Sequence, residues 1–84
     1  MDDPETDPYL AEAKRHVREG EERVARQIML VRSLDAAGRH HEARTARVLL
    51  GTLTDSLDAA RRHLQIEQRG ERARRPWELK RAPR

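Results

Sequence analysis

Two mirrored heptad stripes of mostly apolar residues, one on each side of Gly38, constrain the fold of this chain more than any other feature. Within each stripe the members recur at alternating steps of three and four, which is the a and d spacing of helices packed along a seam. The upstream stripe consists of Leu10, Ala13, Val17, Gly20, Val24, Gln27, Val31 and Leu34. The downstream stripe consists of Ala43, Ala46, Leu50, Leu53, Leu57, Ala60 and Leu64. The pattern predicts an all-α fold, a two-helix antiparallel coiled-coil hairpin.

The two stripes also fit each other if the chain reverses at Gly38 and Arg39. A larger residue then meets a smaller one in most layers, as an interdigitating seam requires. Gly20 lies on the seam, where we expect a close approach of the two backbones, and Gln27 either fixes the register or lies at the edge with its amide in water. The facing pairs are Leu34 with Ala43, Val31 with Ala46, Gln27 with Leu50, Val24 with Leu53, Gly20 with Leu57, Val17 with Ala60, and Ala13 with Leu64.

Helix start and stop signals set the expected boundaries. Asp7 followed by Pro8 is a helix start, with Asp as the N-cap and Pro in the first turn. Gly38 suits the left-handed position that ends a helix, and no residue after it is a good N-cap for the next one. The expected segments are an acidic lead-in at 1–7, a hairpin at 8–69 (helices at about 8–37 and 41–69, turn at 38–40), and a basic flexible tail at 70–84.

One stretch of the second helix leaves an alternative open. Gly51, Thr52 and Thr54 are poor helix formers and stand close together. They allow a kink, or a break after which Thr54 or Asp55 caps a third short helix. The stripe continues through this stretch without a gap, which favours one continuous helix.

Composition excludes several classes of protein. The 84 residues contain no cysteine, which excludes disulfides and thiolate metal sites, and the longest apolar run, Ile28–Val31, is far too short to span a membrane. The acidic start lacks the basic and apolar regions of a signal peptide, so we expect a cytoplasmic protein. Ser33 and Ser56 have no evident general base, and we expect no enzymatic activity and no cofactor.

Apolar residues near the turn extend beyond the seam and predict a second chain. A helix that is apolar all round over one stretch is buried on more than one side, and a hairpin supplies only one partner helix. We therefore expect a homodimer with two-fold symmetry, packed near the turn ends as a four-helix bundle. The predicted interface residues are Ile28, Met29, Leu30, Val48 and Leu49, with Met29, Leu30 and Leu49 central.

Two histidines offer a weaker interpretation. His16 and His63 both occupy heptad position g and come to nearly the same level in the antiparallel register, with Glu12 one turn from the first and Glu67 one turn from the second. Two imidazoles and two carboxylates are a ligand set for zinc or another divalent ion, and paired histidines also suit a pH switch. The simpler interpretation is that both rings cover the edge of the seam with their nitrogens in water.

The tail supports a third interpretation. Residues 69–84 carry seven basic groups against two acidic ones, whereas residues 1–8 carry four acidic groups. A hairpin brings these oppositely charged ends together, so they compete with any external partner. We expect at most weak, sequence-independent nucleic-acid binding through phosphate contacts and stacking. The candidate residues are Arg69, Arg72, Arg74, Arg75, Trp77, Lys80, Arg81 and Arg84.

The first helix resembles one known family. The pattern His16-Val17-x-x-Gly20-Glu21-x-x-Val24-x-x-Gln27 is similar to that of small, uncharacterised bacterial helical-hairpin proteins, over roughly residues 16–64. In that family a Thr often follows the glycine of the turn and caps the second helix, but here His40 and His41 stand in its place. The resemblance implies a bacterial origin and a hairpin, and no assigned activity. We expect a non-enzymatic, homo-oligomeric helical interaction module or regulator.

Overall fold

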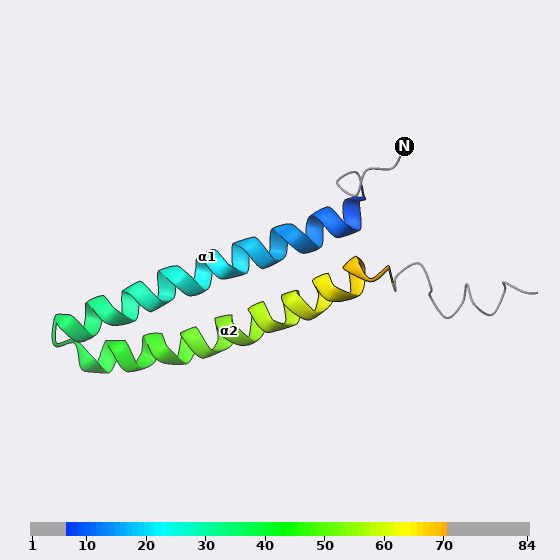
Figure 1. Ribbon diagram of the computed structural model, residues 1–84. Helices are drawn as coiled ribbons and strands as arrows, with labels where there is room; N and C mark the ends of the chain where they lie inside the picture. Colours follow the sequence, from blue (N-terminus) through cyan, green and yellow to red (C-terminus); the bar gives the residue numbers. More distant parts are fainter. Residues whose placement is uncertain (1–6, 71–84) are drawn as a thin grey trace, which may run out of the picture.

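The structure, a computed structural model, describes residues 7–70 and consists there of two antiparallel helices, α1 (Pro8–Ala36) and α2 (His40–Gln68). The helices lie side by side along their length and are joined by a short turn, so that residues 7 and 70 lie at the same end (Figure 1). The predicted helical hairpin is confirmed, and both helices begin and end within one residue of the expected positions.

The start of α1 is capped as the sequence predicts. The Asp7 carboxylate accepts hydrogen bonds from the backbone N–H groups of Tyr9 (3.0 Å) and Leu10 (3.3 Å). Pro8 occupies the first turn, where its missing N–H costs nothing. These contacts satisfy donors that have no partner inside the helix.

The turn is a Schellman motif centred on Gly38, whose φ is +77°. The Gly38 N–H donates to the Asp35 carbonyl (3.0 Å), and the Arg39 N–H donates to the Leu34 carbonyl (2.9 Å). No side chain caps the start of α2, as the sequence led us to expect. Instead Arg39 pairs with Glu42 in the first turn, and the Arg39 hydrogen bond lowers the pKa of the Glu42 carboxyl below its ordinary value.

α2 is continuous through Gly51, so the alternative of a break and a third helix is wrong. The Thr52 and Thr54 hydroxyls donate to carbonyls one turn earlier, at 3.5 Å and 2.9 Å, which accommodates these residues within a helix. The packing of Leu57 and its neighbours on α1 outweighs the weak local preference.

The seam has the predicted register. A Cβ atom built on Gly20 would lie 3.1 Å from Leu57 Cδ1, which confirms that these two residues face each other in close contact. Gln27 is buried, and its amide nitrogen donates to the Ala46 carbonyl across the seam at 2.9 Å. The alternative in which the amide lies in water is therefore wrong, and the hydrogen bond across the seam is consistent with a role of Gln27 in fixing the register. The buried apolar residues are Ala13, Val31, Ala43, Ala46 and Leu57.

The seam of α2 extends one step further than predicted, to Glu67. This residue follows Leu64 at the next heptad step and is only 8% exposed.

Neither described helix has a stretch long and apolar enough to cross a membrane.

Candidate functional site

The two long edges of the hairpin differ in character. We call them the e face and the g face after the heptad positions that form them. The e face comprises Lys14, Glu21, Ile28, Asp35, Arg47, Thr54 and Arg61, and the g face comprises Tyr9, His16, Arg23, Leu30, Glu42, Leu49, Ser56 and His63.

The e face is closed by ion pairs between the helices. Asp35 of α1 pairs with Arg47 of α2, and its other oxygen lies 3.3 Å from His40 Nδ1. Glu21 of α1 pairs with Arg61 of α2 at 3.3 Å. The charges of these groups are already paired across the seam. A further helix packed on this edge would therefore gain little from them.

The g face carries an apolar groove at its turn end. The groove has a volume of about 340 Å³, and Leu30 of α1 and Leu49 of α2 form its two sides. The two side chains are 46% and 48% exposed. The groove is further lined by Gln27, Leu34, Glu42, Thr45 and Ala46.

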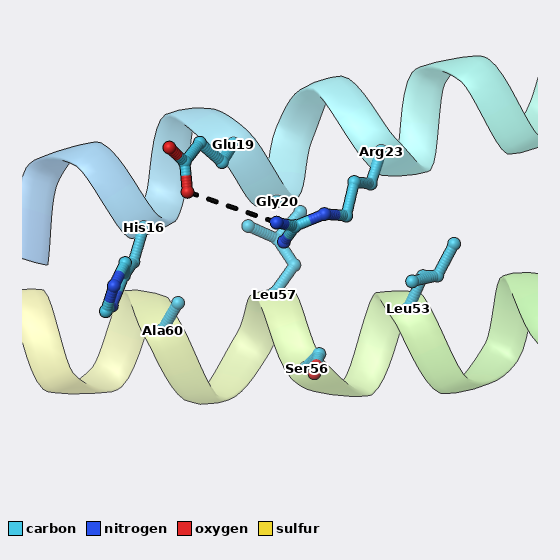
Figure 2. A pocket seen from close by; sticks show the side chains of 8 residues that line it. All are labelled: His16, Glu19, Gly20, Arg23, Leu53, Ser56, Leu57 and Ala60. Carbon is cyan, nitrogen blue, oxygen red and sulfur yellow. Dashed lines mark ion pairs between the residues drawn. The ribbon is translucent and has the colours of Figure 1, made fainter.

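A second groove of about 330 Å³ lies on the same face, midway along the hairpin (Figure 2). It forms where Gly20 has no side chain, and Figure 2 shows Leu57 pointing from α2 toward this position. Arg23 extends along its edge toward Glu19, with 4.0 Å between the paired atoms. Its rim is therefore polar, in contrast to the groove at the turn end.

Ser56 and His16 both line this middle groove, but no hydrogen bond joins them within residues 7–70. A serine becomes a nucleophile when a base accepts its proton at hydrogen-bond distance. The groove is thus a surface feature shaped by packing, and the described residues form no nucleophile and base pair in it.

The candidate metal ligands pair within each helix rather than across the seam. His16 Nε2 lies 3.6 Å from Glu12, and His63 Nε2 lies 3.8 Å from Glu67, so each histidine pairs with a carboxylate of its own helix. Glu67 lies in the seam rather than on the g face. Within residues 7–70, no group of three or more His, Asp or Glu side chains is arranged to hold a metal ion. The described residues therefore give no support to the metal interpretation, and metal binding by His16 and His63 stays an untested prediction.

The five predicted interface residues lie on different sides of the hairpin. Leu30 and Leu49 are on the g face, where they form the apolar groove. Met29 and Val48 occupy the outer f positions and are strongly exposed, whereas Ile28 is half-buried on the e face. The five residues therefore do not form one flat surface of the hairpin, and the central place of Met29 in an interface stays a prediction.

Two exposed apolar residues were not predicted as candidates. Tyr9 (g) and Ile66 (c) are 56% and 43% exposed and occupy g-face and neighbouring c positions at the open end of the hairpin. Exposed apolar residues therefore occur at both ends of this side of the hairpin. The heptad positions of these two residues were the signal in the sequence.

The candidate nucleic-acid residues of the tail, Arg72, Arg74, Arg75, Trp77, Lys80, Arg81 and Arg84, lie outside the described residues. Arg69 is described and directly follows α2. Nucleic-acid binding through this segment stays a prediction from the sequence.

Comparison with protein-family models, curated proteins and solved structures gives no match.

Proposed function

We propose that this chain is a small, non-enzymatic interaction module that acts as a homodimer, with its g face as the contact surface. The observation that carries the proposal is the apolar groove between Leu30 and Leu49. Both leucines are about half exposed in the isolated hairpin, whereas burying a leucine fully contributes roughly 1.5–3 kcal/mol.

The thin core of the hairpin supports the same proposal. The buried apolar side chains are three alanines, one valine and one leucine, and no large side chain of the described residues is fully buried. Small domains with little buried apolar surface commonly depend on a partner chain for stability. A second copy on the g face would add the missing burial.

The proposed setting is the cytoplasm of a bacterial cell. The resemblance of the first helix is the support for a bacterial origin, and a reducing compartment agrees with the cysteine-free composition. In this setting the dimer acts as an adaptor or regulator through binding.

Sedimentation equilibrium at micromolar concentration tests the proposal. We expect a mass twice that of the 9.8 kDa chain. Leu49→Glu puts a charge into the groove and should yield a monomeric or unfolded chain. The matched control is Thr54→Glu, which makes the same residue on the e face of α2 and should remain dimeric. A folded wild-type monomer at this concentration overturns the proposal.

A further inference from the structure

α2 bears a second heptad stripe, which faces away from the seam. Its members recur at steps of four and three, all are exposed, and none is Asp, Glu, Lys or Arg. Every charged residue of α2 between 43 and 66 lies at position b, e or f instead. The stripe consists of Thr45, Leu49, Thr52, Ser56, Ala59, His63 and Ile66. A helix with two uncharged stripes is suited to pack against two helices.

The stripe has a large apolar residue near each end, with small residues at its middle and His63 next to the open end. Leu49 stands at the turn end and Ile66 at the open end, about half exposed in each case. On the g face α1 likewise has Leu30 at the turn end and Tyr9 at the open end, although His16 and Arg23 lie between them. The small residues in the middle allow two helices to approach closely. A second copy in reversed orientation matches this pattern at both ends.

We propose that a second copy of the chain occupies this face with the two α2 helices antiparallel, so that Leu49 of each copy faces Ile66 of the other. In the same register Thr52 faces His63, and the two-fold axis passes between Ser56 and Ala59. This inference rests on the proposed homodimer and specifies its geometry. It replaces contact between the two turn ends with contact along roughly 30 Å of α2.

Charge complementarity on α2 favours this register. Asp55 and Arg62 flank the stripe at position f, and neither makes an ion pair within residues 7–70. They are separated by two turns of one helix, so they do not reach each other within a chain. In the antiparallel pair Asp55 of each copy lies beside Arg62 of the other, which gives two symmetric ion pairs.

The charges of α1 on the same side agree. Glu12 lies toward the open end and Arg26 toward the turn end, both at position c, whereas Glu19 between them already pairs with Arg23 of its own helix at 4.0 Å. Because Gly20 faces Leu57 beside the two-fold axis, reversed packing brings Glu12 of one α1 level with Arg26 of the other. Contact between turn ends would instead bring the arginines of both copies together, which like-charge repulsion opposes.

Thiol crosslinking tests the register, because the native chain has no cysteine. Thr52→Cys and His63→Cys proteins are mixed, allowed to exchange, and treated with a short bis-maleimide crosslinker. We expect a crosslinked heterodimer from the mixture and none from either protein alone, since like positions are then about 16 Å apart along the helix axis. Thr54→Cys on the e face, mixed with His63→Cys, is the control and should not crosslink.

The outcomes separate this inference from the proposed function. A Leu49→Cys protein that crosslinks to itself, together with no link in the Thr52 and His63 mixture, would show a dimer joined at its turn ends. The register would then be wrong while the homodimer stands. A wild-type chain that sediments as a monomer would overturn both.

A charge exchange gives an independent readout. Asp55→Arg and Arg62→Asp each place like charges beside each other in a homodimer, so each variant alone should dimerise several-fold more weakly than wild type. An equimolar mixture should form a heterodimer in which both ion pairs are restored. Equal dimerisation of the single variants and their mixture would contradict the register.

Discussion

The e face and the g face are the two edges of the same seam, but residues of different chemistry occupy them. On the e face, Asp35 and Glu21 of α1 reach across to arginines of α2. On the g face, Leu30 and Leu49 stand at equivalent positions and leave a groove between them. The contrast is the reason for proposing the g face, and not the e face, as the side where a further helix binds.

The largest expected effect comes from giving the g face the character of the e face. Leu30→Glu combined with Leu49→Arg places an ion pair across the turn-end groove. The helical hairpin should remain, while the dissociation constant of the dimer should rise at least about a hundredfold, because two leucines per copy lose their burial. Sedimentation equilibrium measures the change, and circular dichroism checks the helix content. A dimer of unchanged affinity would show that the groove is not the contact surface.

A smaller effect, on the free energy of unfolding, is expected from substitutions that test how the middle groove arises. Gly20→Ala should lower the free energy of unfolding by about 1 kcal/mol. The new methyl group crowds Leu57, and the cost of this crowding exceeds the stabilisation that alanine gives a helix. Gly51→Ala is the matched control, since no atom lies within 4 Å of its added Cβ. It should raise the free energy of unfolding by about 1 kcal/mol. Urea denaturation measures both, and equal effects of the two changes would remove the argument for close packing at Gly20.

The smallest expected effect is on the e face. Asp35→Ala removes an exposed ion pair with Arg47 and should lower the free energy of unfolding by about 0.2–1 kcal/mol at low salt. The loss should fade in 1 M salt, where exposed charges are screened, and the dimer should be unaffected. Glu22→Ala is the control, because Glu22 makes no ion pair within residues 7–70. A loss that persists at high salt would indicate a packing role for Asp35.

The features predicted correctly from the sequence are local or periodic. Asp7 and Gly38 act on their immediate neighbours, so their cap and turn roles can be inferred from residue type alone. The a and d stripes repeat often enough to fix both the pairing and the register, including the contact of Gly20 with Leu57. Such signals need no knowledge of how distant side chains are oriented.

The features that could not be predicted from the sequence depend on side-chain direction. The heptad pattern places His16 and His63 on one edge, but each ring contacts a carboxylate of its own helix, and Glu67 turns into the seam. The second stripe of α2 was not predicted either, because threonine, serine and histidine make up most of it and do not form an apolar pattern. Only the exposed environment of these residues in the hairpin shows that they form one face.

The tight turn at Gly38 also bears on how the chain folds. Residues that pair beside the turn, such as Leu34 and Ala43, are close in sequence, whereas Ala13 and Leu64 at the open end are far apart. Closing a short loop costs less entropy than closing a long one, so the first contacts form next to Gly38. Each new layer then shortens the loop that the next one must close. The hairpin can therefore assemble as a zipper from its turn, and its open end should be the first part to separate when the chain fluctuates.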